Sequence, residues 1–263
     1  MTSNYAHCLS VLTDFLKRTS KVPCALCHSS SPDGICEYCY ERYLENLPSR
    51  CRCCGNTAAI HESPRNIPCA QCLKTPPSFD ETIVACDYAP PLDQLVLSLK
   101  FQSRLALAPL IGKLIHRTIE KQQRPDGWQP DFIIAVPLGR ARLIERGFNQ
   151  SHEIARTLAR LMGIPLRSDL IYRNRETDKQ STVPFVKRKN NVRNAFSVQD
   201  IPRPAFKGLH IGVVDDIMTT GHTLEEIARL LKKAGVERIT NFIFPRTPSG
   251  LLQENRSVSR RTL

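Results

Sequence analysis

The pattern of hydrophobic and polar residues changes at about residue 80. Beyond that point, short apolar runs at 79–88, 131–137, 210–214 and 238–244 alternate with longer stretches whose apolar residues recur at helical spacing. Continuous apolar runs bounded by Gly, Pro or polar residues are typical of parallel strands that are buried on both faces. The alternation of strand and helix therefore predicts an α/β fold with a parallel sheet flanked by helices.

Three stretches carry the helical pattern. Residues 91–122 predict one or two helices, and residues 149–162 repeat apolar side chains on one face. A further predicted helix covers 223–234 and ends at Gly235, a residue type that often follows a helix. These helices and the apolar runs assign residues 80–248 to one α/β domain.

Residues 20–75 have a different composition, rich in Cys, Pro, Ser and other polar residues and poor in long apolar periods. A segment of this kind cannot build a stable hydrophobic core without a cross-link or a bound metal. All 11 cysteines of the chain lie within its first 86 residues. We therefore predict a small cysteine-stabilised domain over 20–75, ahead of the α/β domain.

Eight of these cysteines form four Cys-x-x-Cys pairs. Both thiolates of such a turn can face one ion, and four thiolates at about 2.3 Å complete a tetrahedral Zn²⁺ site. Two pairs fill one site and leave no open position for water, so four pairs predict a double zinc ribbon with two structural sites. Free or redox-active cysteines are the alternative, which four successive pairs disfavour. The predicted ligands are Cys24, Cys27, Cys36, Cys39, Cys51, Cys54, Cys69 and Cys72.

The sequence leaves the pairing of these cysteines open. Sequential pairing places the first two Cys-x-x-Cys pairs in one site and the last two in the other, and we prefer it to a crossed arrangement. Cys53 interrupts the regular spacing and competes with Cys54 as a ligand. A disulfide scaffold would require an export signal, and the N-terminal residues do not have the pattern of one.

Composition and charge limit the classes of partner. Apolar residues make up 41% and charged residues 24% of the chain, as in folded soluble proteins. The formal net charge is +12 and the pI is about 9.4, which fits either a polyanionic partner or a solvated basic surface. No apolar run approaches the roughly 20 residues that span a bilayer. We expect a cytoplasmic protein without membrane insertion.

The strongest chemical signal lies in residues 213–223. A predicted strand ends there with Asp215 and Asp216 at its carboxyl end, where open α/β sheets bind ligands. Residues 219–223 lead into a helix, so their backbone N–H groups and hydroxyls can hold a dianionic phosphate. The two acids can accept hydrogen bonds from vicinal ribose hydroxyls, which points to a sugar phosphate. The alternative is an ordinary turn with Thr223 as helix N-cap; a Walker loop would need a following Gly-Lys-Ser/Thr.

This segment resembles the signature of type I phosphoribosyltransferases for phosphoribosyl pyrophosphate (PRPP), in which two apolar residues precede two acids and a Thr-Thr-Gly-x-Thr loop. The chain is similar over almost its whole length to the ComF/GntX family of competence and DNA-utilisation proteins. The marks of this family are the paired cysteines, Leu-Lys-Phe at 99–101, Val-Pro-Leu at 136–138, Arg-Gly-Phe-Asn-Gln at 146–150, Gln180, Arg188, Asn191, Ala-Phe at 195–196 and the PRPP signature.

The resemblance implies a role for each matching position. The acids at 215 and 216 are the catalytic pair that holds the ribose hydroxyls, and residues 219–223 receive the 5′-phosphate. The turn at 137–140 binds pyrophosphate, whose charge Mg²⁺ and basic side chains offset. Residues 173–193 form a mobile hood over the reacting centre. The implied PRPP-binding residues are Val214, Asp215, Asp216, Met218, Thr219, Thr220, Gly221, His222, Thr223, Pro137, Leu138, Gly139 and Arg140, and the hood or basic residues are Arg146, Lys179, Gln180 and Arg188.

Two classes of function fit these residues. One is a Mg²⁺-dependent transferase that uses PRPP and an unidentified acceptor, as in nucleotide salvage; the other is a non-catalytic module that senses PRPP or handles single-stranded DNA. The resemblance favours a role in DNA uptake and utilisation during competence. PRPP or another ribose 5-phosphate, single-stranded DNA and DNA-uptake proteins are the candidate partners. Tyr38, Tyr40 and Tyr43 have a spacing that fits base stacking and local packing equally.

Overall fold

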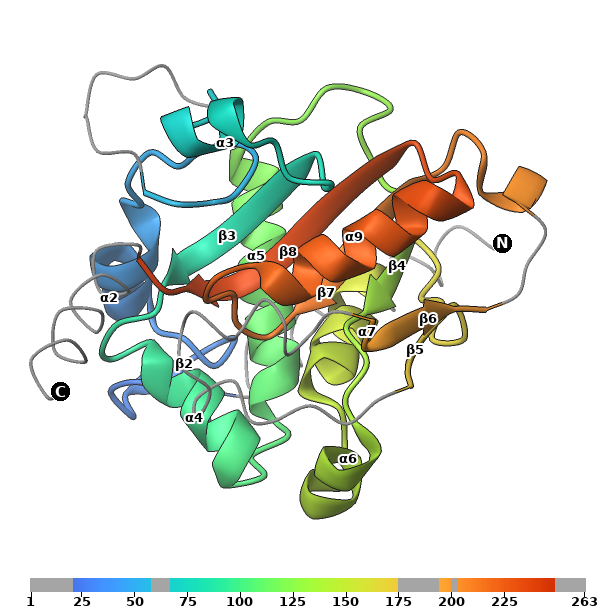
Figure 1. Ribbon diagram of the computed structural model, residues 1–263. Coiled ribbons are helices and arrows are strands. Elements are labelled where there is room, and N and C mark those ends of the chain that lie inside the picture. Colours follow the sequence, from blue (N-terminus) through green and yellow to red (C-terminus); the bar gives the residue numbers. More distant parts are fainter. Residues whose placement is uncertain (1–20, 58–66, 175–193, 200–202, 249–263) are drawn as a thin grey trace, which may run out of the picture. The chain divides into compact units, whose positions relative to one another are not determined.

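A computed structural model describes residues 21–57, 67–174, 194–199 and 203–248 (Figure 1). The packing of the chain separates two compact units, Met1–Leu47 and Pro48–Leu263. The later half of the cysteine-rich segment therefore belongs to the unit that holds the sheet. The limits of 20–75 and 80–248 for the two domains stay a prediction.

The centre of the larger unit is a parallel sheet of four strands. The strands are β3 (Glu81–Asp87), β4 (Phe132–Ala135), β7 (His210–Asp215) and β8 (Arg238–Arg246), in the order β3-β8-β7-β4. Each neighbouring pair is parallel. Side chains of β7 and β8 such as Ile211 and Phe242 are fully buried, which explains the continuous apolar runs. The predicted parallel α/β fold is confirmed.

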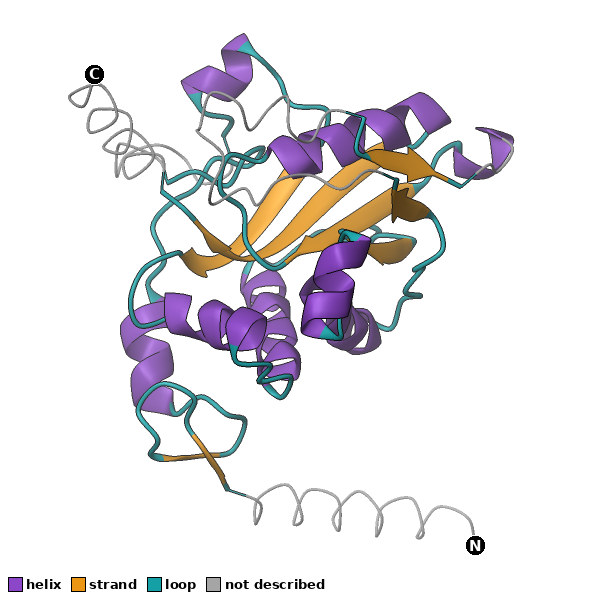
Figure 2. Cartoon of the chain, turned by 60° about the horizontal axis from the view of Figure 1, so that its bottom comes forward, coloured by secondary structure: helices purple, strands orange, loops and turns teal. Residues whose placement is uncertain are grey.

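Helices cover both faces of this sheet (Figures 1 and 2). Helices α5 (Leu107–Lys121) and α7 (Gln150–Met162) pack on one face, and α9 (His222–Ala234) lies on the other. Gly112 allows α5 to approach α7 closely, because a Cβ there would lie 2.8 Å from Cβ of Thr157. Two further helices, α4 (Asp93–Phe101) and α6 (Arg140–Arg146), follow the carboxyl ends of β3 and β4.

Shorter elements complete the two units. In the smaller unit, β1 (Val22–Pro23) pairs with β2 (Ser30–Ser31), and α2 (Glu37–Tyr40) continues into a π-helical turn at Glu41–Glu45. In the larger unit, α3 (Ala70–Lys74) follows a cysteine pair, β5 (Ile171–Arg173) pairs antiparallel with β6 (Phe196–Val198), and a 3₁₀ turn covers Arg203–Phe206. Among the described residues, no helix has the length and apolar character required to cross a membrane.

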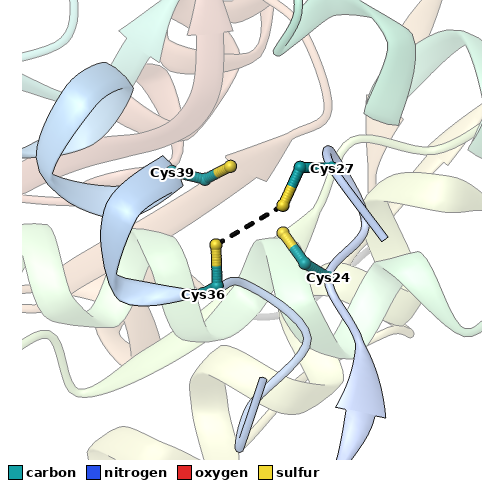
Figure 3. Close-up of side chains that lie close together, drawn as sticks. All are labelled: Cys24, Cys27, Cys36 and Cys39. Atoms are coloured by element: carbon teal, nitrogen blue, oxygen red, sulfur yellow. Dashed lines mark hydrogen bonds between the residues drawn. The ribbon is translucent and has the colours of Figure 1, made fainter. Parts of the chain in front are cut away.

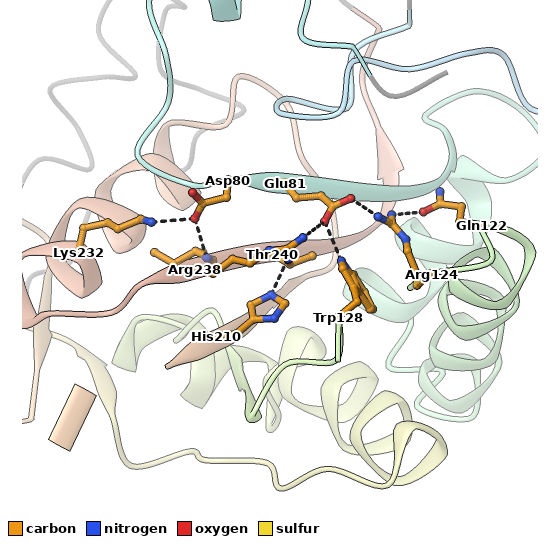
Figure 4. Close-up of polar contacts among 10 residues, drawn as sticks. Asp80, Glu81, Gln122, Arg124, Trp128, His210, Lys232, Arg238 and Thr240 are labelled. Atoms are coloured by element: carbon orange, nitrogen blue, oxygen red, sulfur yellow. Dashed lines mark hydrogen bonds and ion pairs between the residues drawn. The ribbon is translucent and has the colours of Figure 1, made fainter. Parts of the chain in front are cut away.

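The amino-terminal edge of the sheet is closed by a network of paired polar groups (Figure 4). The carboxylate of Glu81 is almost completely buried and accepts hydrogen bonds from Nε1 of Trp128 at 3.0 Å, from Arg238 at 3.0 Å and from Arg124. Although burial alone raises it, the Trp128 hydrogen bond and the Arg124 guanidinium hold the pKa of Glu81 below its usual value. These contacts satisfy the buried carboxylate of Glu81 and join β3 to β8 and to the segment that precedes β4.

Candidate functional site

Two neighbouring carboxylates stand at the opposite, carboxyl-terminal edge of the sheet. Asp215 is the last residue of β7 and Asp216 follows it. Oδ1 of Asp215 accepts hydrogen bonds from Oγ of Ser151 and from the backbone N–H of Asp216, each at 3.0 Å. Burial and the neighbouring charge of Asp216 raise the pKa of Asp215 to about 7. The pair is thus held in a defined position next to the start of α7.

Lys100 supplies a cation to this pair. Its Nζ lies 3.0 Å from Oδ2 of Asp216, and both side chains are largely buried. The sequence contains Lys100 within its Leu-Lys-Phe mark but gives no sign of the ion pair, which links α4 to the loop after β7. A carboxylate pair with one matched cation retains acceptor oxygens for a diol or a divalent ion.

The loop after the carboxylates leads directly into α9. Gly221 precedes the helix with φ at +81°, and a Cβ at this position would lie 2.6 Å from Cε of the buried Met218. The left-handed conformation therefore favours glycine here, and a larger residue would also displace the flexible end of the Met218 side chain. Thr219, Gly221, His222 and Thr223 line a small cavity together with Asp215, Ile217, Met218 and Leu224. The structure thus brings the predicted phosphate loop and Asp215 to one cavity.

The turn predicted to bind pyrophosphate follows β4. Residues 136–139 are irregular, whereas Arg140 is the first residue of α6 and is exposed. The side-chain amide of Asn149 donates to the carbonyl oxygen of Val136 at 3.0 Å, and its Oδ1 caps α7 by accepting from the backbone N–H of Ser151. This double role of Asn149 fixes the turn relative to the helix that carries Ser151.

The basic residues expected near the site are described only in part. Nη1 of Arg146 donates to Oε1 of Gln150 at 3.1 Å, and its guanidinium lies 5.5 Å from the centre of the Phe101 ring. Burial lowers the pKa of Arg146, and the charge of Asp216 opposes that effect. Strand β5 ends at the first residue of the predicted hood, and β6 follows the hood. Lys179, Gln180 and Arg188 are outside the described residues.

The first set of cysteines gathers in the smaller unit (Figure 3). The sulfur atoms of Cys24, Cys27, Cys36 and Cys39 all lie within 4.8 Å of one another, and those of Cys27 and Cys36 are 3.5 Å apart. Hydrogen bonds from Ser29 lower the pKa of the Cys27 thiol to about 6. Four thiols at this separation fit a tetrahedral Zn²⁺ site, for which sulfur atoms are about 3.8 Å apart.

The second set lies in the larger unit. The sulfur atoms of Cys51, Cys54, Cys69 and Cys72 are also within 4.8 Å of one another, and those of Cys54 and Cys69 are 3.8 Å apart. Hydrogen bonds from the Cys54 side chain and from the backbone N–H groups of Cys54 and Cys69 lower the pKa of Cys51 to about 4. The structure groups the pairs in sequential order, and Cys54 rather than Cys53 completes this set.

Comparison with known proteins gives consistent matches. Residues 102–260 match the family model described as the phosphoribosyl transferase domain. The chain is 38% identical to the DNA utilization protein YhgH of Salmonella typhimurium over 228 residues, which are 86% of this chain and 95% of that protein. It is 31% identical to competence protein F of Haemophilus influenzae over 208 residues, or 79% of this chain and 88% of the relative. Competence protein ComFC of Bacillus subtilis is 34% identical over 116 residues, 44% of either chain.

Proposed function

Since this chain belongs to the family of DNA utilization and competence proteins that carry a phosphoribosyl transferase domain, we propose that it binds PRPP with Mg²⁺ at the carboxyl edge of β7. The observation that carries the proposal is the placement of Asp215 and Asp216 at the end of a central parallel strand, followed at once by a Thr-Thr-Gly-His-Thr loop at the start of α9. Ligands of open α/β sheets bind at this edge.

Each part of the ligand has a complementary group. The carboxylates of Asp215 and Asp216 accept hydrogen bonds from the two ribose hydroxyls, and Ser151 and Lys100 hold those carboxylates in place. The 5′-phosphate lies in the loop of residues 219–223, where the positive end of the α9 dipole favours a dianion. Mg²⁺ supplies charge neutralisation for the pyrophosphate when it binds with PRPP.

Chemistry beyond binding requires an acceptor. Displacement of pyrophosphate from C1 of PRPP builds positive charge on the ribose ring and negative charge on the leaving group. The fixed carboxylates beside the ribose suit the first charge, and basic residues such as Arg140 and Arg146 suit the second. Pyrophosphate release measured with a panel of nucleobases distinguishes a transferase from a PRPP sensor: release with one base identifies the acceptor, whereas binding without release favours the sensor.

The cysteine sets and the basic charge support the remaining parts of the proposal. Each set fits one structural Zn²⁺, which supports the proposal of two zinc ions per chain. The net charge of +12 and the DNA utilization named for a relative favour contact with DNA, which we expect to be single-stranded and to bind in the cytoplasm. If DNA binds through its phosphates, its affinity falls steeply with rising salt, and an affinity that stays constant contradicts this contact.

The PRPP site is tested by isothermal titration calorimetry of the full chain with PRPP and Mg²⁺. For the double variant Asp215→Asn/Asp216→Asn we expect loss of binding by roughly 100-fold or more, because two charge-assisted hydrogen bonds to the ribose are removed. Asp169→Asn is the matched control, since Asp169 is an exposed carboxylate that pairs with Arg167 at 2.8 Å. Equal affinity of the double variant and the control would show that the carboxylates do not bind the ligand.

A further inference from the structure

A single buried guanidinium joins the second cysteine set to the phosphate loop. Arg246 is the last residue of β8 and its side chain is almost completely buried. Its Nε donates to Oδ1 of Asn56 at 3.0 Å, and its Nη1 donates to the carbonyl oxygen of Thr219 at 3.0 Å. One rigid, planar group therefore contacts both the cysteine turn and the loop that is proposed to hold phosphate.

On one side of Arg246, Asn56 is part of the turn that presents the cysteine ligands. The backbone N–H of Cys51 donates to the carbonyl of Asn56 at 2.8 Å, and that of Gly55 donates to the carbonyl of Cys51 at 2.9 Å. The turn packs directly on the sheet, since a Cβ at Gly55 would lie 2.5 Å from Cγ2 of Val84 and 3.4 Å from Cδ of Arg246. The geometry of this turn thus determines where the Asn56 side chain stands.

On the other side, the phosphate loop is attached to the end of β8. The backbone N–H of Met218 donates to the carbonyl of Pro245 at 3.1 Å, and that of Thr247 donates to the carbonyl of Met218 at 2.9 Å. The hydrogen bond from Arg246 to the carbonyl of Thr219 holds the next residue of the loop as well. It fixes the peptide group between Thr219 and Thr220, and therefore the direction of the Thr220 N–H in the predicted phosphate loop.

We propose that metal binding at the second cysteine set positions Arg246 and, through it, the phosphate loop, so that occupancy of this set controls the affinity for PRPP. The proposal rests on the proposed function of the loop. Arg246 acts here as a positioning residue, because it contacts the loop carbonyl and not the ligand. The first cysteine set serves as an internal comparison, since the hydrogen bonds of its cysteines join residues 24–40 to one another.

The test compares single variants of the full chain by zinc content and by calorimetric titration with PRPP and Mg²⁺. Cys54→Ser and Cys36→Ser should each lose one of two zinc ions, but only Cys54→Ser should weaken PRPP binding, by roughly 5- to 150-fold, the usual range of coupling between sites. Arg246→Gln should keep both zinc ions and weaken binding to a similar extent. Asn56→Ala should also weaken PRPP binding, but by a smaller factor.

Arg238→Gln is the matched control for a basic side chain on the same strand. Arg238 is the first residue of β8 and its guanidinium lies 3.0 Å from Oε2 of Glu81 at the amino-terminal edge of the sheet, so its variant should bind PRPP like the wild type. Hydrogen exchange of residues 217–223 can be measured without ligand, and it should accelerate in Arg246→Gln but not in Arg238→Gln.

The outcomes separate this inference from the proposed function. A wild-type chain that does not bind PRPP contradicts the proposed function itself. Wild-type binding that persists unchanged in Cys54→Ser and Arg246→Gln overturns the coupling alone, as does equal weakening in Cys54→Ser and Cys36→Ser. Should Cys54→Ser fail to fold, unchanged affinity and unchanged loop exchange in Arg246→Gln and Asn56→Ala overturn it.

Discussion

The two cysteine sets each consist of two Cys-x-x-Cys pairs but have different surroundings. The first set lies in a unit whose described residues include few buried hydrophobic side chains besides cysteine, namely Ile35, Tyr40 and Leu44. The second set shares a unit with the parallel sheet, and the backbone N–H of Thr82 on β3 donates to the carbonyl of Arg52 at 2.9 Å. The same motif therefore closes a small unit in one place and extends a large core in the other.

We therefore expect the first set to stabilise its own unit and the second set to influence the proposed PRPP site. A small unit with little core depends on its metal, as zinc fingers do, and metal binding there mainly determines whether the unit folds. A set that is built onto a sheet has the core to support its backbone, so its metal can influence neighbouring groups without being needed for the fold. The following predictions test this contrast, from the largest expected effect to the smallest.

Loss of metal from the first set should unfold the smaller unit. For Cys36→Ser we expect hydrogen exchange in residues 22–45 to approach unfolded rates, because structural zinc contributes about 10–16 kcal/mol in zinc-finger peptides. Exchange in β7 and β8 should stay at the wild-type level. The control is Cys53→Ser, which alters a cysteine outside both sets. Retained protection of residues 22–45 in a zinc-depleted Cys36→Ser variant would contradict the dependence on metal.

The close packing of the second set on the sheet is tested at Gly55. Gly55→Ala should lower the free energy of unfolding by about 2–4 kcal/mol, because it combines left-handed backbone strain with a clash. Gly163→Ala is the matched control: its φ of +69° is close to the +68° of Gly55, but a Cβ there would meet no atom within 4 Å. We expect it to cost about 1 kcal/mol, the strain alone. Equal losses in urea denaturation of the two variants would show that the turn is not held against β3.

The pH dependence of stability should arise in the larger unit. The pKa of Asp215 is raised to about 7 from 3.8, so the folded chain binds more protons than the unfolded chain between these values. The stabilisation that Asp215 contributes to the folded state is fully present below its unfolded pKa and is lost as the pH rises through its folded pKa. Between pH 6 and 8 the free energy of unfolding should fall by about 1 kcal/mol.

The variant Asp215→Asn isolates this contribution. It should remove the fall in stability between pH 6 and 8, as measured by chemical denaturation monitored on the sheet. Asp169→Asn again serves as the control and should keep the wild-type slope, since it changes an exposed carboxylate. A slope that is the same in the wild type and Asp215→Asn would assign the pH dependence to another group.

Patterns that repeat along the chain predicted much of this structure. The buried strands and the helices at 149–162 and 223–234 leave a periodic signal in the sequence, and the Cys-x-x-Cys pairs are themselves local. Helix α6 was not predicted, because none of its residues is buried and its pattern therefore lacks a core-facing stripe. Its first residue, Arg140, was placed in the predicted pyrophosphate turn.

Contacts between distant positions could not be predicted in this way. Ser151 and Asp215 are 64 residues apart, and Arg246 and Asn56 are 190 residues apart. Neither partner of such a pair has a local pattern that indicates the other, because the contact exists only once the sheet has formed. The Lys100–Asp216 ion pair belongs to the same class. The carboxylates and the loop were predictable, whereas the groups that hold them in position were not.

The most direct test of the PRPP site is hydrogen exchange of the full chain with and without PRPP and Mg²⁺, measured by mass spectrometry. The ligand should slow exchange in residues 213–224, which contain both carboxylates and the loop, and in residues 136–140. The Asp215→Asn/Asp216→Asn variant should show no such slowing at the same ligand concentration. Slowed exchange elsewhere in the wild type, with residues 213–224 unaffected, would contradict the assignment of this edge of the sheet as the PRPP site.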